Sequence, residues 1–116
     1  MHLMIEISVT PIDNKIAVVK LTGRLDLTAA PELRSLLTKT VEQGYTHLVL
    51  DMGAVVAVDS SGLGALVSGL KTARLAGGDL RLAHLGQQPL LVLRTTTLDR
   101  VFALHDSVDA ALVGYR

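Results

Sequence analysis

The stretch Asp59-Ser60-Ser61-Gly62-Leu63-Gly64 lies where the sequence changes from one hydrophobic pattern to another. Before it, segments 47–51 and 55–58 are apolar and rich in β-branched residues, as strands are. After it, apolar residues recur with the i, i+3, i+4, i+7 spacing of one helix face: Leu63, Leu66, Val67 and Leu70. We therefore predict that a helix begins at residues 59–61, where an Asp or Ser oxygen caps the free backbone N–H groups.

A serine at the start of a helix is a candidate phosphate acceptor. The free N–H groups and the positive end of the helix dipole favour a negative group there. A phosphate on Ser60 or Ser61 would add a charge of about −1.5 to −2 in that environment. The alternative is that these serines and Asp59 serve only as a helix cap.

Composition limits the classes of function. The chain has 116 residues, no cysteine, and 11 basic residues against 11 acidic ones, so its formal net charge is zero. One domain over residues 1–116 is expected, without disulfides or thiolate metal sites. A neutral chain has no broad field that attracts nucleic acid or an anionic membrane. No apolar run approaches the roughly 20 residues of a membrane span, and residues 1–8 lack a signal-peptide pattern. We expect a cytoplasmic protein.

Hydrophobic periodicity and turn residues predict the remaining elements. Strands are expected at 2–10, 15–22, 46–52, 79–85 and 101–104, and residues 23–26 end the second strand. Helices are expected from about residue 28 to Gly44, from 60 to 75, from Pro89, and after a cap at Asp106 or Ser107. Strands that alternate with helices form parallel sheets, and the opening hairpin adds an antiparallel strand. The predicted fold is a single α/β domain with a mixed, mostly parallel sheet of about five strands and about four helices.

Several polar residues follow the predicted strands. Asp26 follows the second strand, Asp51 ends the third, and Asp59 and Ser60 lie just beyond it. Functional groups in open α/β sheets gather at the carboxyl ends of strands. We therefore expect a site at this edge of the sheet.

The helix after the serines is unusually rich in small residues. Gly62, Gly64 and Gly69 each cost roughly 0.5–1 kcal/mol relative to alanine inside a helix. The face opposite the leucine stripe also carries small side chains: Ser61, Ala65, Ser68, Gly69 and Thr72. We interpret this face as a docking surface for a partner protein. The alternative, tight packing inside the domain, stays open for Gly62 and Gly64, whereas Gly69 is assigned to docking.

Three segments together resemble the STAS domain family, specifically the small bacterial anti-sigma-factor antagonists. Residues 21–26 (LTGRLD) resemble the family's strand end before its first helix, and residues 49–52 (VLDM) its central strand. Residues 59–64 (DSSGLG) resemble its phosphorylation motif. The similarity spans nearly the whole chain and is weaker over residues 98–112.

The resemblance implies a phosphorylation switch rather than an enzyme. The unmodified protein would bind an anti-sigma factor that is also a serine kinase, and so free a sigma factor. Phosphorylation at Ser60 would break that complex, and a serine phosphatase would reset it. Asp26 matches a family position implicated in contact with the kinase. A phosphate at Ser60 would join Asp59, Asp26 and Asp51 in an acidic patch that repels a closely packed partner.

Other readings of the same residues remain open. The chain could be a STAS subunit of another assembly, such as a stress-signalling scaffold or a lipid transporter, with Ser60 structural. A serine hydrolase would need a base and an oxyanion hole, and the G-x-S-x-G pattern is absent around Ser60 and Ser61. The four histidines show no metal-ligand spacing, and no glycine loop that would hold a nucleotide phosphate is present. No metal or cofactor is expected, and the sequence leaves open whether the protein is a monomer or a weak homodimer.

Overall fold

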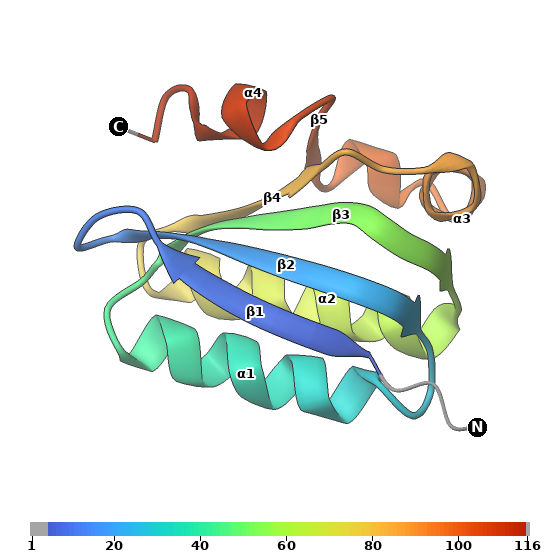
Figure 1. Ribbon diagram of the computed structural model, residues 1–116, viewed down its shortest axis with the longest axis horizontal. Helices are drawn as coiled ribbons and strands as arrows, with labels where there is room; N and C mark the ends of the chain where they lie inside the picture. The colour runs from blue at the N-terminus through green and yellow to red at the C-terminus, as the bar shows by residue number, and fades with distance from the viewer. Residues whose placement is uncertain (1–4, 116) are drawn as a thin grey trace.

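Five strands form one mixed sheet in the computed structural model, which describes residues 5–115 (Figure 1). The elements follow in the order β1 (Glu6–Pro11), β2 (Ile16–Leu25), α1 (Ala30–Glu42), β3 (His47–Val58), α2 (Ser60–Leu75), β4 (Asp79–Ala83), α3 (Gln87–Thr95), a 3₁₀ turn η1 (Leu98–Arg100), β5 (Ala103–His105) and α4 (Val108–Leu112). The spatial order of the strands is the same as their order in the chain, β1-β2-β3-β4-β5. The predicted α/β fold with a mixed, mostly parallel sheet is confirmed.

The first two strands form the predicted hairpin. β1 pairs with β2 antiparallel, and the other neighbouring pairs are parallel. Asp13 closes the turn, since its Oδ1 accepts hydrogen bonds from the N–H groups of Lys15 at 2.8 Å and Ile16 at 2.9 Å. The strand predicted at residues 2–10 begins at Glu6 and ends at Pro11, Ile5 lies before it, and residues 2–4 lie outside the described range.

Helices cover both faces of the sheet. α1 and α2 lie side by side below the sheet in Figure 1, and α3 and α4 lie above it. The larger core fills the space between the sheet and the α1/α2 layer with leucines such as Leu21, Leu37, Leu50 and Leu66. A smaller cluster lies between α4 and the sheet: Ile16, Val49, Ala83, Ala111 and Leu112. Alternate residues of a strand point to opposite faces of the sheet, and helices cover both of these faces.

Two central strands are longer than the sequence predicted. β2 does not end at Gly23 but continues to Leu25, with Gly23 at φ 115° beside a register shift against β3. A side chain is strained in that backbone region, so a glycine carries the strand through it. The segments predicted around residues 46–52 and 55–58 form one continuous strand, β3, that reaches Val58.

The edge of β3 facing β4 changes its partner part of the way along. The β3–β4 ladder ends at the pair Asp51–Ala83, although β3 continues to Val58. At the far end of β3, the Gln88 side chain of α3 bonds to the main chain of Val58. Its Oε1 accepts from the Val58 N–H at 2.8 Å, and its Nε2 donates to the Val58 carbonyl at 3.1 Å. The α3 helix is thereby fixed to the carboxyl end of β3.

The last third of the chain follows the predicted order with shifted boundaries. α3 begins at Gln87, and Pro89 lies in its first turn, where proline is tolerated. β5 begins at Ala103 rather than residue 101, because the chain turns at Val101 to bury Phe102. Ser107, one of the two predicted caps, accepts from the Ala110 N–H at 3.0 Å and caps α4. Among the helices of residues 5–115, none has both the length and the apolar composition that crossing a bilayer requires.

Candidate functional site

Ser60 is the first residue of α2, as the sequence predicted, and it is exposed to solvent. Asp59 is the N-cap in extended backbone, and its Oδ1 accepts the Gly62 N–H at 2.9 Å. Ser61 is half-buried. Ser60 therefore lies at the positive end of the 16-residue helix α2. An added phosphate would therefore stand in solvent beside backbone donors.

Asp59 also joins α2 to the preceding loop. Its Oδ2 accepts the Leu27 N–H at 3.2 Å, and its own N–H donates to the Leu25 carbonyl at 3.2 Å. Both carboxylate oxygens are thus used, one within the helix and one across to the loop between β2 and α1. This double use holds the loop in a fixed place relative to Ser60.

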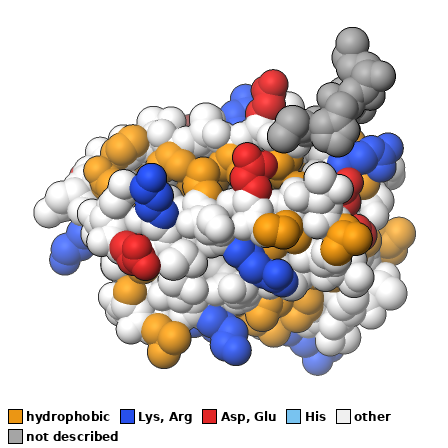
Figure 2. Space-filling view, turned by 90° about the horizontal axis from the view of Figure 1, so that it is seen from below, with side chains coloured by type: hydrophobic (Ala, Val, Ile, Leu, Met, Phe, Trp, Pro, Cys, Tyr) orange, Lys and Arg blue, Asp and Glu red, His pale blue; other side chains and the backbone are white. Residues whose placement is uncertain are grey.

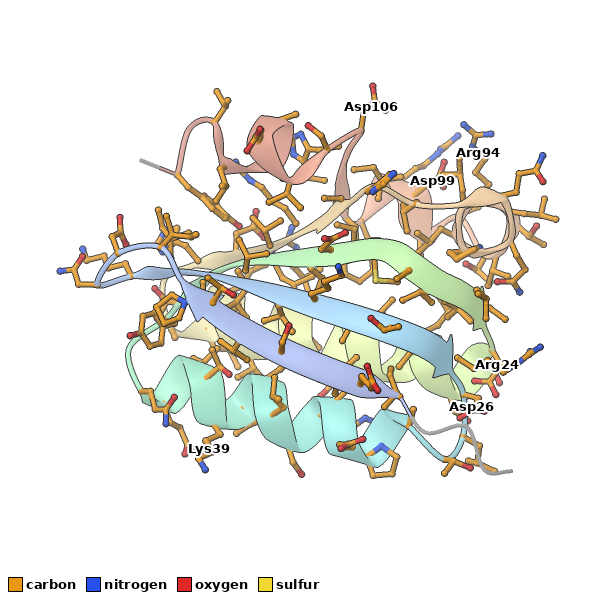
Figure 3. All side chains as sticks on the ribbon, viewed as in Figure 1. Arg24, Asp26, Lys39, Arg94, Asp99 and Asp106 are labelled. Carbon is orange, nitrogen blue, oxygen red and sulfur yellow. The ribbon has the colours of Figure 1, made fainter. Side chains whose placement is uncertain are left out.

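Asp26 lies at the same end of the sheet, close to the start of α2 (Figure 3). Its Oδ1 accepts hydrogen bonds from the N–H groups of Thr28 and Ala29, both at 3.1 Å. The carboxylate therefore orders the entry to α1. The sequence placed Asp26 and Asp59 at one edge, and the structure brings them together around Leu27.

Asp51 does not belong to this edge, so its assignment to the acidic patch was wrong. It lies in the middle of β3, level with Lys20 of β2 and Ala83 of β4. Its Oδ1 accepts the N–H of Gly53 at 3.1 Å. The error follows from the predicted end of the third strand at residue 52, since β3 continues to Val58.

The small-residue face of α2 is not a single exposed surface. Gly62, Ala65 and Gly69 are buried. A side chain at Gly69 would collide with Leu37 of α1 and lie 3.1 Å from Leu80 Cδ1, so this glycine lets α1 and α2 approach each other. The interpretation of Gly69 as a docking residue is therefore corrected, because small residues on a helix also permit close packing inside a domain.

Gly62 and Gly64 differ in what a side chain would meet at each position. A Cβ at Gly62 would strike the Leu25 carbonyl, which fixes the first turn of α2 against the end of β2. A Cβ at Gly64 would meet only the Nη2 atom of Arg34 at 2.9 Å, at the flexible end of an exposed side chain. The sequence left open whether these glycines serve docking or internal packing. Gly62 serves internal packing, whereas Gly64 is half-exposed.

The accessible part of the predicted docking surface is a shallow hollow on α2. Its volume is about 380 Å³. It is lined by Gly64, Val67, Ser68, Lys71, Thr72 and Leu75. The Thr72 hydroxyl donates to the Ser68 carbonyl at 3.0 Å, so this hydroxyl turns back onto the helix. Figure 2 shows the face of the molecule on the α1/α2 side, where apolar side chains are interspersed with basic and acidic ones. This hollow is the remaining candidate for partner contact along α2.

Sequence reasoning missed one residue beside Ser60. Leu27 is 74% exposed although it is a large apolar side chain. The signal was present, since a leucine directly after Asp26 stands outside the hydrophobic pattern of either flanking element.

The surroundings of the serines show no catalytic constellation. Within residues 5–115, no histidine is hydrogen-bonded to Ser60 or Ser61. The same residues hold no group of three His, Asp or Glu side chains that could bind a metal ion. The described residues therefore form no Ser-His-Asp triad at Ser60 or Ser61.

Comparison with known proteins defines the class. The STAS domain family profile matches residues 8–111, and the chain belongs to this family. The anti-sigma-B factor antagonist of Bacillus subtilis is 34% identical over 80 residues, which cover 69% of this chain and 72% of that protein. A Thermotoga neapolitana protein named as an anti-sigma factor antagonist is 32% identical over 72 residues, 62% of this chain and 64% of that protein. The match thus spans slightly less than two-thirds of the Thermotoga relative.

Solved structures agree with this fold. An anti-sigma factor antagonist from Mycobacterium paratuberculosis is 28% identical, with a TM-score of 0.83 over 93% of this chain and 91% of that one. The Bacillus cell-fate determinant SpoIIAA in its phosphorylated form has a TM-score of 0.76 at 18% identity, over 96% of this chain and 100% of that one. At that identity, the second likeness concerns the fold alone.

Proposed function

We propose that this chain is an anti-sigma-factor antagonist controlled by phosphorylation at Ser60. The unphosphorylated form binds an anti-sigma factor that is also a serine kinase, and a sigma factor is released. The kinase transfers phosphate to Ser60, and the phosphorylated form loses its affinity. A serine phosphatase restores the binding form.

The observation that carries this proposal is the position of Ser60. It is exposed at the first residue of α2, directly after the Asp59 cap. The names of the Bacillus subtilis and Thermotoga relatives support the antagonist role.

The loss of affinity follows from charge. Asp26 and Asp59 already place two carboxylates at this edge, and the phosphate adds about −1.5 to −2 more. A partner whose basic side chains match only these two carboxylates would have to desolvate the added phosphate charge without a cation of its own. Desolvated, unmatched charge at an interface costs several kcal/mol, roughly a thousandfold in affinity.

The proposal is tested with serine kinases of the anti-sigma type from the same organism. The purified protein is incubated with ATP and each kinase, and the phosphate is located by mass spectrometry. Wild type and Ser61→Ala are expected to be modified at Ser60, whereas Ser60→Ala is not. Ser60→Asp is expected to bind the kinase more weakly than Ser60→Ala.

Three outcomes would contradict the proposal. Phosphate found only at another residue would remove Ser60 from the switch. Tight kinase binding by Ser60→Asp would show that charge at this site does not control the complex. A chain that binds no such kinase would instead belong to another assembly with Ser60 in a structural role.

A further inference from the structure

Leu27 lies in the loop between β2 and α1, beside the start of α2. Its side chain is 74% exposed. A single exposed leucine is ordinary on a protein surface, so exposure alone carries no meaning. The significance of Leu27 comes from the hydrogen bonds that fix its backbone and from the charged groups around it.

Hydrogen bonds on both sides fix the loop that carries Leu27. Its own N–H donates to Asp59 Oδ2 at 3.2 Å, and Asp59 is the residue directly before Ser60. On the other side, Asp26 Oδ1 accepts from the N–H groups of Thr28 and Ala29. The backbone on which Leu27 stands is therefore ordered before any partner arrives. A side chain on a preordered backbone loses less entropy on binding than one on a mobile loop.

The charges around Leu27 are acidic and unpaired. Asp26 precedes it in the chain and Asp59 is bonded to its N–H. Within residues 5–115, neither carboxylate forms an ion pair, although Arg24 extends from the same end of the sheet (Figure 3). The surface next to Ser60 is thus an apolar side chain flanked by two carboxylates.

We propose that Leu27 is the apolar anchor by which the Ser60 kinase recognises this chain. The kinase would present an apolar pocket flanked by basic side chains, next to the site that receives the Ser60 hydroxyl. This inference rests on the function proposed above and deepens it. Asp59 acts as a positioning residue, because it connects the anchor to the serine.

The anchor makes recognition depend on the fold. Leu27 and Ser60 are far apart in the sequence and are brought together by the Asp59 carboxylate. A peptide that contains only the DSSGLG motif lacks the anchor. Such a peptide is expected to be a poor substrate even though it carries the complete modification motif.

The test uses the intact protein and the kinase that modifies its Ser60. Steady-state kcat/KM for phosphorylation is compared for wild type, Leu27→Asp, Leu27→Met and Val113→Asp. Val113 is the matched control, because it is 75% exposed and is the C-cap of α4, the helix that lies above the sheet in Figure 1. Both residues are exposed, so the thermal unfolding midpoints of the variants should stay close to that of wild type, and this is measured in parallel.

Leu27→Asp is expected to lower kcat/KM by about 10- to 100-fold, the equivalent of losing one buried leucine at an interface. Leu27→Met and Val113→Asp are expected to stay within about twofold of wild type, because methionine conserves the apolar volume and Val113 lies elsewhere. Equal kinetics for Leu27→Asp and wild type, or equal losses for both aspartate variants, would overturn the inference while the proposed function stands. Absence of Ser60 phosphorylation in the wild type would overturn the proposed function itself.

Discussion

The same substitution at two glycines of α2 is expected to have opposite effects on stability. Gly62 and Gly64 both lie in the first two turns of the helix, and the two variants compared are Gly62→Ala and Gly64→Ala. Alanine is favoured over glycine in a helix by about 0.5–1 kcal/mol, so propensity alone predicts a gain at both positions. The surroundings of the new Cβ determine whether that gain is realised.

At Gly64 the nearest atom is the Nη2 of Arg34, at 2.9 Å, and this flexible side chain can move away. We expect Gly64→Ala to stabilise the protein by about 0.5–1 kcal/mol. At Gly62 the new Cβ would lie 2.8 Å from Leu25 Cγ and 3.0 Å from the Leu25 carbonyl carbon. Carbon atoms pack best at about 3.5–4.0 Å, and a backbone cannot rotate away. Overpacking costs about 1–3 kcal/mol, which after the propensity gain leaves a net loss of up to about 2.5 kcal/mol for Gly62→Ala.

Equilibrium unfolding in urea, followed by circular dichroism, measures both variants. The free energies of unfolding should differ by about 1–3 kcal/mol, the cost of overpacking at Gly62, with unchanged m values. If both alanines stabilise the protein equally, the contact between α2 and the end of β2 is looser than described. If Gly64→Ala destabilises as much as Gly62→Ala, the reasoning about Arg34 is wrong.

Three further substitutions test other contacts. Asp59→Ala removes the α2 cap and the bond to Leu27, and should cost about 1–2 kcal/mol in urea unfolding, whereas an alanine at exposed Asp109 should cost little. Arg81→Met removes two 2.7 Å bonds to carbonyls of the α4 segment, and should speed amide hydrogen exchange there without affecting α1. Burial, followed by the charge of Asp79, raises the pKa of the Tyr115 hydroxyl above its ordinary value of 10.0. The folded state therefore holds this proton more tightly than the unfolded state. The resulting contribution to the free energy of unfolding is complete below pH 10 and is lost as the pH rises above 10. Tyr115→Phe should show a shallower loss of stability between pH 10 and 11 than wild type, by up to about 1.4 kcal/mol per pH unit, and equal slopes would show that the hydroxyl titrates as in water.

The order of elements and the start of α2 could be predicted from the sequence because their signals are local. A cap residue, two serines and an apolar stripe at helical spacing fix the start at Ser60 without reference to the rest of the chain. The hairpin turn at Asp13 is equally local. Such features keep their meaning whatever the tertiary packing is.

The errors arose where the answer depends on a neighbour far away in the sequence. Gly69 carries the same local signal whether it faces solvent or Leu37 of α1, and only the packing of two helices distinguishes the cases. The end of β3 was misplaced because segments 46–52 and 55–58 look separate in the sequence, whereas pairing with β2 joins them into one strand that reaches Val58. That one error also moved Asp51 into a site to which it does not belong.

The amide of Gln88 has a consequence for solubility. Where β4 stops, the outer side of β3 would otherwise offer its main-chain groups to any passing extended chain. One side-chain amide, with a donor and an acceptor in the right order, occupies both groups of Val58. It imitates the missing neighbour with a single residue, and so closes the carboxyl end of β3, at Val58, to pairing with a second copy of the chain.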